Sequence, residues 1–239
     1  MDTQKQNGAM SLVKAVFPHT IPVMTGYVFM GMAFGILLAS KGYGPGWAFL
    51  MAVIIFAGSA QFVAVGLLAA GFDVLNAMLI ILMVNARHIF YSIGMLERFK
   101  QYGRLRAYMI FALTDETFAL LNATKTPTGI SEEKFGFTLA LMNQSYWVLG
   151  CTMGGFLGTA LPINTKGIDF VMTALFTVVF LEQWQNRKNR TPALIGLAAA
   201  LACRLLFGPQ WFILASMAVL VVVFSLTRPL LEERGHRDV

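Results

Sequence analysis

The chain has 239 residues, of which 57% are hydrophobic and only 13% are charged, whereas a typical soluble domain carries about 25% charged residues. This composition excludes an ordinary soluble domain, because too much apolar surface would face water. The net charge of +6 does not indicate nucleic-acid binding, since the basic residues lie between apolar blocks and form no patch with interleaved aromatic residues. We therefore expect an integral membrane protein embedded in a lipid bilayer.

The hydrophobic residues gather into blocks close to the length that an α-helix needs to cross a bilayer, about 20 residues. Because backbone groups in lipid must be hydrogen-bonded within their own segment, each block is a candidate helix. Together the blocks predict an all-α, polytopic transmembrane helical bundle that forms one integral membrane domain over 1–239. They lie at 14–39, 46–71, 72–96, 107–123, 135–161, 168–185, 192–206 and 208–227.

The number of membrane spans depends on segment 107–123, which is short and carries Asp115 and Glu116 in its middle. Cytoplasmic loops are enriched in Lys and Arg. If all eight segments cross the membrane, ten loop and terminal Lys and Arg residues lie inside and six outside; if 107–123 enters and leaves on the cytoplasmic face, thirteen lie inside and three outside. We therefore expect seven spans, with eight as the alternative, and broken or re-entrant helices among them.

Proline and glycine recur in the first and fifth segments. Pro18 and Pro22 either belong to a closely packed helix or mark a broken helix whose free carbonyl groups line a cavity, and the sequence leaves both interpretations open. Gly150 and Gly154 have the spacing of small residues at closely packed helix contacts, which favours a packing role. The Gly-Pro pair at 208–209 predicts a break between the last two segments.

Polar residues inside apolar segments are candidates for function, since a charge at mid-membrane costs at least about 2.5 to 3.5 kcal/mol. The densest cluster lies near the end of the third segment, where Asn85, Arg87, His88 and Tyr91 are spaced so that one side of a helix is polar. Alternatively, Arg87 extends to the interface and Tyr91 joins an aromatic belt.

Asp115 and Glu116 form the second cluster. Adjacent carboxylates cannot share one helix face, so these two should have different partners. One of them can neutralise Arg87 or His88. Membrane carboxylates and histidines often carry protons in secondary transporters, which favours a proton relay; ordinary solvated acids in an interfacial loop are the alternative.

A third cluster carries no charge. Gly58, Ser59 and Gln61 lie near the middle of the second segment, and a comparable set of small polar residues lies at 143–145 in the fifth. Ordinary interhelical hydrogen bonding would satisfy Gln61. The pair of clusters also fits a transporter built from two structural halves with a site at their interface.

These residues occur in motifs that resemble the AzlC family of branched-chain amino acid exporter subunits. The motifs follow the family's order and cover most of the chain. They are GYVFMGMAFG at 26–35 after Pro22, FAGSAQF at 56–62, NARHIFY at 85–91, TDETF at 114–118, and IDF at 168–170 followed by ALF at 174–176. The last of them adds Asp169 to the candidate site residues.

The resemblance implies export of branched-chain and other neutral amino acids, such as valine, leucine, isoleucine or methionine, across the bacterial inner membrane. It also implies a small second membrane subunit of the AzlD type. Our hypothesis for the mechanism is proton-coupled antiport by alternating access, in which His88 and Asp115 or Glu116 bear protons and Arg87 is a counter-ion. The candidate substrate-binding or proton-coupling residues are Gly58, Ser59, Gln61, Asn85, Arg87, His88, Tyr91, Asp115, Glu116 and Asp169.

Two other classes of function remain as alternatives. The same polar groups would suit a transporter of another small polar metabolite. A membrane-embedded enzyme is less favoured, because the sequence has no Walker loop, dinucleotide fingerprint or metal-binding histidine pair. We therefore expect no catalytic residues, no cofactor and no metal.

Overall fold

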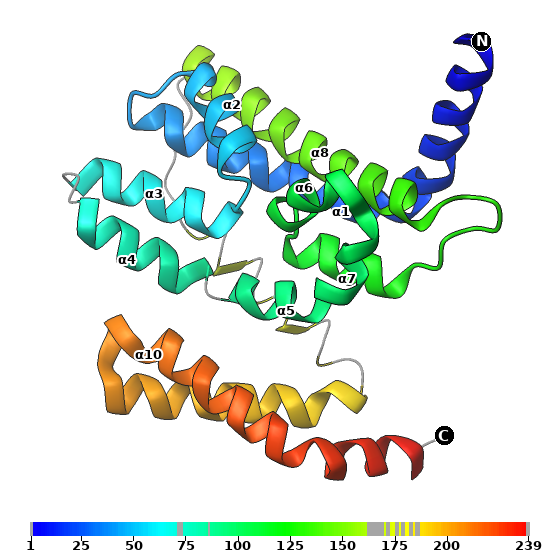
Figure 1. The fold of residues 1–239 in the computed structure, drawn as a ribbon. Helices are drawn as coiled ribbons and strands as arrows, with labels where there is room; N and C mark the ends of the chain where they lie inside the picture. The colour runs from blue at the N-terminus through cyan, green and yellow to red at the C-terminus, as the bar shows by residue number, and fades with distance from the viewer. Residues whose placement is uncertain are drawn as a thin grey trace. The chain divides into compact units, whose positions relative to one another are not determined.

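The structure is a computed structural model that describes residues 2–70, 74–85, 87–161, 170, 173, 174, 177, 180, 181, 184 and 187–237. Among these residues there are helices and turns but no strand, which confirms the all-α class (Figure 1). The chain divides into two compact units. Met1–Ile81 and Arg87–Val171 form the first, and Leu82–Ala86 and Met172–Val239 form the second.

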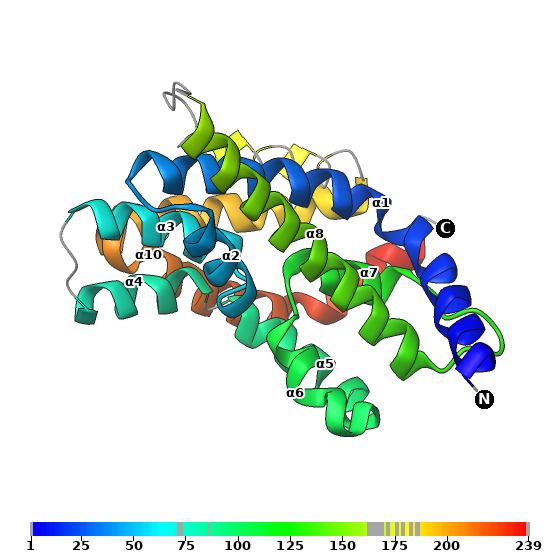
Figure 2. The same cartoon turned by 90° about the horizontal axis from the view of Figure 1, so that it is seen from above.

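Two long helices, α1 (Asp2–Ser40) and α8 (Glu132–Ala160), run parallel and in contact through the first unit (Figures 1 and 2). Near their starts, Val16 packs against Phe135 in one buried hydrophobic cluster. Further along, a Cβ atom on Gly31 would lie only 2.8 Å from the backbone nitrogen of Cys151. The contacts therefore keep the same order along both helices.

Glycine is what lets α1 and α8 approach so closely. A Cβ atom on Gly150 would lie 2.7 Å from the carbonyl oxygen of Val28, and one on Gly154 would overlap the backbone of Met32. The predicted packing role of these two glycines is confirmed. Helix α1 is continuous through Pro18 and Pro22, so the interpretation of the first segment as a broken helix is wrong.

The second predicted segment, 46–71, is not one helix but two, α2 (Pro45–Ile54) and α3 (Gly58–Ala70). Helix α2 runs antiparallel to α8: Pro45 lies against Gly155, and the Val53 carbonyl oxygen accepts a hydrogen bond of 3.2 Å from Gln144 Nε2. The chain then reverses at 55–57. We call α2 and α3 together hairpin 1.

Helix α3 returns toward the end of α1 from which α2 departs. At its start, Gly58 faces the ring of Trp147, which lies 5.5 Å from the ring of Tyr27. One turn later, Phe62 contacts Phe34, with ring centroids 5.7 Å apart. Because Phe34 lies about two turns beyond Tyr27 along α1, hairpin 1 enters and leaves at the same end of this unit (Figure 1).

The third predicted segment also consists of two helices, α4 (Val74–Asn85) and α5 (Arg87–Phe99), followed by the short 3₁₀-helix η1 (Lys100–Leu105). Helix η1 packs on the start of α8, where the Tyr102 hydroxyl donates a hydrogen bond of 3.3 Å to the Glu132 carbonyl oxygen. Burial raises the pKa of Tyr102 above its usual value, so this hydroxyl keeps its proton at neutral pH.

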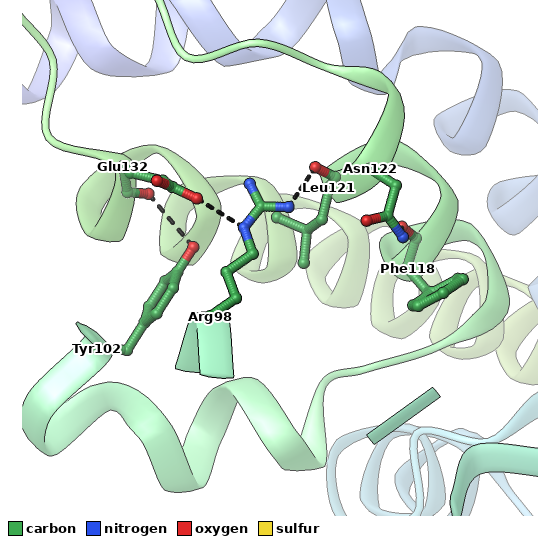
Figure 3. A network of polar contacts seen from close by, with 6 residues as sticks. All are labelled: Arg98, Tyr102, Phe118, Leu121, Asn122 and Glu132. Atoms are coloured by element: carbon green, nitrogen blue, oxygen red, sulfur yellow. Dashed lines mark hydrogen bonds and ion pairs between the residues drawn. The ribbon is translucent and has the colours of Figure 1, made fainter. Parts of the chain in front are cut away.

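The fourth predicted segment is again two helices, α6 (Arg106–Phe111) and α7 (Asp115–Ala123), which we call hairpin 2. Arg98, which precedes the hairpin, donates one hydrogen bond to the carbonyl oxygen of Leu121 near its end. The same guanidinium pairs with Glu132 of α8 at 2.6 Å (Figure 3). Both ends of hairpin 2 therefore lie at the start of α8.

The tips of the two hairpins meet against the packed pair of α1 and α8. The rings of Phe56, at the tip of hairpin 1, and Phe111, at the tip of hairpin 2, have centroids 6.2 Å apart. Hairpin 1 extends to this point from the end of α1 that carries Ser40, and hairpin 2 extends to it from the start of α8. Since α1 and α8 are parallel, the hairpins point toward each other from opposite ends of the unit.

The second unit is dominated by α10 (Arg187–Arg237), which has a non-helical residue at Gly208, with φ of +72°. The predicted break at this glycine is confirmed. Among the described residues, two helices are long and apolar enough to cross a membrane by length and composition, Met10–Ser40 and Arg190–Gly208. The total of seven or eight spans is not confirmed by this test, and most of 168–185 lies outside the described residues.

Candidate functional site

Tyr27 of α1 contacts the tips of both hairpins and is only 4% exposed. Its hydroxyl donates a hydrogen bond of 2.7 Å to Glu116 Oε2 and lies 2.7 Å from Thr114 Oγ1, both on hairpin 2. Its ring makes edge contacts with Phe56 of hairpin 1 and with Trp147 of α8. One tyrosine thus connects four elements that are far apart in the sequence.

The start of α7 explains why two acids occur inside an apolar segment. Thr114 has an extended backbone and caps the helix, since its Oγ1 accepts a hydrogen bond of 3.2 Å from the Thr117 backbone nitrogen. Asp115 and Glu116 occupy the first turn, where the partial positive charge of the helix terminus stabilises carboxylates. The bond from Tyr27 shows that Glu116 is not an ordinary solvated acid.

Helix α8 holds both hairpins through two residues one turn apart. Asn143 Nδ2 donates a hydrogen bond of 3.1 Å to Thr117 Oγ1 of hairpin 2. Trp147 Nε1 donates one of 2.8 Å to Gln61 Oε1 of hairpin 1. Asn143 and Gln61 are both fully buried, so these bonds form inside the packed unit.

Each of these two amides leaves one polar atom without a hydrogen-bond partner among the described residues. The atoms are Gln61 Nε2 and Asn143 Oδ1. An indole N–H can only donate, so Trp147 fixes the oxygen of Gln61 toward itself and leaves the NH₂ group unbonded. Leaving a buried polar atom unsatisfied costs about 1 to 3 kcal/mol, so both atoms require an explanation.

The backbone at the tip of hairpin 1 is strained. Phe56 has φ of +39°, and it is the one described residue other than glycine with a positive φ. A bulky side chain rarely adopts this conformation, which costs on the order of 1 to 3 kcal/mol and persists only where the surroundings enforce it. Here the surroundings are the rings of Tyr27 and Phe111.

The structure brings half of the predicted site residues together at the hairpin tips. They occupy the first turns of α3 and α7 and are Gly58, Ser59, Gln61, Asp115 and Glu116. The sequence predicted these two clusters separately. Their meeting depends on Tyr27, which contacts both hairpins, and on Trp147, which bonds Gln61 of hairpin 1 and contacts Tyr27.

His88 and Tyr91 form a second group on α5. Their rings lie 5.9 Å apart, and Tyr91 stacks on Phe118 of α7 with centroids 4.9 Å apart. Asn85 is the last residue of α4 and Arg87 is the first of α5. Asp169 lies outside the described residues. The predicted pairing of Asp115 or Glu116 with Arg87 or His88 stays a prediction.

The sequence analysis missed three contributors to the site, Tyr27, Thr117 and Trp147. Tyrosine and tryptophan in apolar segments usually belong to the core or to an interfacial belt, so their type gives no specific signal. Asn143 was noted within a polar cluster but was not included in the predicted site. The signal that can identify a residue like Asn143 is a polar side chain in the middle of an apolar segment.

The similarity of the chain to known proteins covers the whole region that forms this site. Residues 22–161 match the sequence profile of the family described as AzlC protein. The chain belongs to the AzlC family. The matched residues include both hairpins and, on α1 and α8, Tyr27, Asn143 and Trp147.

Relatives of the chain are membrane or transport proteins by name. The branched-chain amino acid transport protein AzlC of Bacillus subtilis is 39% identical, over 96% of this chain and 90% of the relative. An uncharacterized membrane protein of Helicobacter pylori (strain J99) is 43% identical, over 92% and 96%. The inner membrane protein YgaZ of Escherichia coli is 31% identical, over 75% and 77%. No solved structure matches the chain.

Proposed function

We propose that the protein is the large subunit of a secondary transporter that exports branched-chain amino acids, and other neutral amino acids such as methionine, across the bacterial inner membrane. Membership of the AzlC family supports amino-acid transport, since the Bacillus subtilis relative is named a branched-chain amino acid transport protein. The name of the Escherichia coli relative, an inner membrane protein, supports the location.

The observation that carries the proposal is the meeting of the two hairpin tips at Tyr27. A helix that ends inside the membrane leaves backbone groups that need partners, and transporters use such ends to bind substrates and coupling ions. The tips contain a half-buried carboxylate, Glu116, bonded to the buried Tyr27, and two unsatisfied amide atoms. A bundle with a purely structural role would have no need of these costly groups.

The arrangement of the hairpins also fits one membrane topology. In this topology both hairpins are re-entrant, and they enter the membrane from opposite sides. The segments that cross the membrane are α1, α4 together with α5, α8, and the three predicted segments 168–185, 192–206 and 208–227. All loop and terminal Lys and Arg residues then lie on one side, except Lys41 and Lys166. By the positive-inside rule that side is the cytoplasm. This segregates charge better than either seven or eight spans.

Proton coupling completes the proposed mechanism. Glu116 is the leading proton carrier, because it is a carboxylate bonded to the buried hydroxyl of Tyr27. Asp115 and His88 are further candidate carriers, and Arg87 is the candidate counter-ion. The two hairpins would open alternately, one toward each side of the membrane. The site at their tips, with Glu116 and the substrate, would then face first one compartment and then the other.

The proposed complex contains a small AzlD-type membrane subunit, as the family resemblance implies. Large apolar side chains are exposed on α2 and α4, for example Trp47 at 55% and Met78 at 65%. In a membrane protein such a surface contacts lipid or another helix. The surface is therefore compatible with a helical partner.

The experiment measures efflux of preloaded, labelled isoleucine, leucine, valine and methionine from cells that express this chain, with and without the small subunit. We expect efflux of at least one of them only when both chains are present, and we expect a protonophore to abolish it. Cells with the small subunit alone are the control.

Absence of efflux of all four amino acids, with the chain confirmed in the membrane, would contradict the amino-acid assignment and favour another small polar metabolite. Efflux that continues unchanged after collapse of the proton gradient would contradict proton coupling while leaving the substrate class intact. Efflux without the small subunit would contradict the two-chain requirement.

A further inference from the structure

The two unsatisfied amide atoms at the hairpin tips have opposite hydrogen-bonding character. Gln61 Nε2 is a donor and Asn143 Oδ1 is an acceptor, and both side chains are fully buried. Their other amide atoms are fixed, by Trp147 and Thr117 respectively. A ligand that offers one acceptor and one donor would satisfy both atoms, whereas a single ion can satisfy only one of them.

The surroundings of Gln61 favour a negative charge. Gln61 lies in the first turn of α3, a helix of 13 residues with no acidic residue in that turn. The terminus of such a helix carries unbonded N–H groups and a partial positive charge. Gly58, the first residue of α3, packs directly on the Trp147 ring. The unbonded NH₂ group therefore adds to a site that suits a carboxylate.

The surroundings of Asn143 favour a positive charge. Its bonding partner Thr117 lies on α7, in the turn that also carries Asp115 and Glu116. Glu116 accepts a hydrogen bond from Tyr27 at the same tip. The unbonded carbonyl oxygen of Asn143 is thus accompanied by carboxylate groups, which suits an ammonium group.

Helix α8 and the hairpin tips form the region between the surroundings of Gln61 and those of Asn143. Asn143 and Trp147 lie one turn apart on α8, and the ring of Trp147 contacts Tyr27. The rings of Phe56 and Phe111 face each other across the tips. Aromatic rings next to an oppositely charged pair of subsites form a setting for an apolar side chain. The strain at Phe56 fits a functional position for this tip.

We propose that the hairpin tips bind the head group of a zwitterionic amino acid, its carboxylate at Gln61 Nε2 and the start of α3, and its ammonium group at Asn143 Oδ1 and Glu116. This assignment rests on the proposed function and specifies its binding site. In this assignment hairpin 1 provides Gln61 and the start of α3, hairpin 2 provides Glu116, and α8 bonds to both hairpins.

The test uses the purified full-length chain together with its small subunit and three probes. L-leucine carries both charges, 3-methylbutylamine lacks the carboxylate, and 4-methylpentanoate lacks the ammonium group. Each Kd is obtained from the dependence of the thermal unfolding midpoint on probe concentration, since a ligand that binds the folded state raises this midpoint. The midpoint without ligand reports whether each variant is folded.

We expect Gln61→Met to raise the Kd for leucine about 10-fold to 100-fold, as loss of a hydrogen bond to a charged group predicts, and to leave the Kd for 3-methylbutylamine unchanged. Asn143→Leu should raise the Kd for leucine similarly and leave the Kd for 4-methylpentanoate unchanged. Each variant then weakens binding only of probes that carry the charged group bound by the replaced residue.

Two further variants guard against unfolding as the explanation. Gln61→Glu has nearly the same shape and keeps an acceptor for Trp147, but it places a carboxylate where the substrate carboxylate would bind, so leucine binding should be lost. Ser145→Ala is the matched control on α8, because Ser145 is exposed and, among the described residues, bonds only the carbonyl oxygen of Leu141. Its Kd for leucine should equal that of the wild type.

Leucine binding by the wild type with unchanged Kd values in Gln61→Met and Asn143→Leu would overturn this site while leaving the proposed function intact. Equal weakening of all three probes in each variant would also overturn it. A folded wild-type complex that binds neither leucine nor isoleucine, valine or methionine would contradict the proposed function itself.

Discussion

At the scale of single residues, the chain places a carboxylate in an apolar setting by using the start of a helix. Thr114 caps α7, Glu116 lies in its first turn, and Tyr27 donates to Glu116 from α1. Movement of hairpin 2 away from α1 would break the hydrogen bond from Tyr27 to Glu116. A group whose environment changes with conformation is suited to take up and release a proton.

Glu116→Gln is the substitution that tests this role. The amide keeps an oxygen that can accept the hydrogen bond from Tyr27, but it cannot carry a proton. We expect leucine efflux driven by the proton gradient to fall at least about ten-fold. Exchange of internal for external leucine should fall less, because Gln61 and Asn143 still bind the head group. Both rates are measurable with labelled leucine in membrane vesicles.

The control for this experiment is Glu97→Gln. Glu97 is 85% exposed in its side chain and, in the part of the chain that the structure describes, pairs only with Lys100, so both rates should match those of the wild type. A Glu116→Gln protein that retains full gradient-driven efflux would show that another group carries the proton.

At the scale of helices, the contact between α1 and α8 positions both hairpins, because each hairpin is bonded to residues of this pair. The contact consists largely of glycine on both sides. A Cβ atom on Gly35 would overlap the Cys151 carbonyl oxygen and the Gly155 backbone nitrogen, and backbone atoms cannot move aside as a flexible side chain can. The hairpin site therefore depends on residues that do not touch it.

Gly35→Ala should accordingly destabilise the protein, by about 1 to 3 kcal/mol or more, and lower its thermal unfolding midpoint in detergent. The matched variant is Gly26→Ala in the same helix. A Cβ atom on Gly26 would meet no atom of the described residues within 4 Å, and alanine favours a helix over glycine by about 0.5 to 1 kcal/mol. The thermal unfolding midpoint of Gly26→Ala should equal or exceed that of the wild type. Equal midpoints for the two variants would contradict the packing argument.

At the scale of the whole molecule, the hairpins decide the proposed membrane topology. Arg98 bonds both Leu121 and Glu132 (Figure 3), so the loops before and after hairpin 2 lie at the same end of the first unit. The parallel course of α1 and α8 places the loop at Lys41 at the other end. In the proposed topology these two ends face opposite sides of the membrane. If 107–123 crossed the membrane instead, the loops before and after it would lie on opposite sides.

Single cysteines at exposed positions distinguish these topologies, after Cys151 and Cys203 have been replaced by alanine. We expect Lys41→Cys and Val74→Cys to react with a membrane-impermeant maleimide added to intact cells. Lys100→Cys and Lys125→Cys should react only after the membrane is opened. All four positions lie outside or at the ends of the helices that cross.

The labelling of pairs decides between the alternatives. Opposite accessibility of Lys100→Cys and Lys125→Cys would mean that 107–123 spans the membrane, and opposite accessibility of Lys41→Cys and Val74→Cys would mean that 46–71 does. Labelling with a permeant maleimide is the control that each cysteine is present and reactive.

The sequence by itself determined the class of the protein and the places where its polar residues cost energy. Long apolar blocks specify helices in a bilayer. Gln61, Asp115 and Glu116 were predictable as site candidates because polar groups are rare in such blocks. The break at Gly208 was predictable from a glycine followed by proline. These features are local and need no knowledge of packing.

Only the tertiary structure decided that 46–71 and 107–123 are hairpins and that their tips meet. Hydropathy is nearly the same for a segment that crosses and for one that turns back, so it does not distinguish them. The contacts that do, from Tyr27 to Glu116 and from Gln61 to Trp147, join residues more than 80 positions apart. Such contacts form only because glycines allow α1 and α8 to pack closely, and that packing is a property of the folded chain.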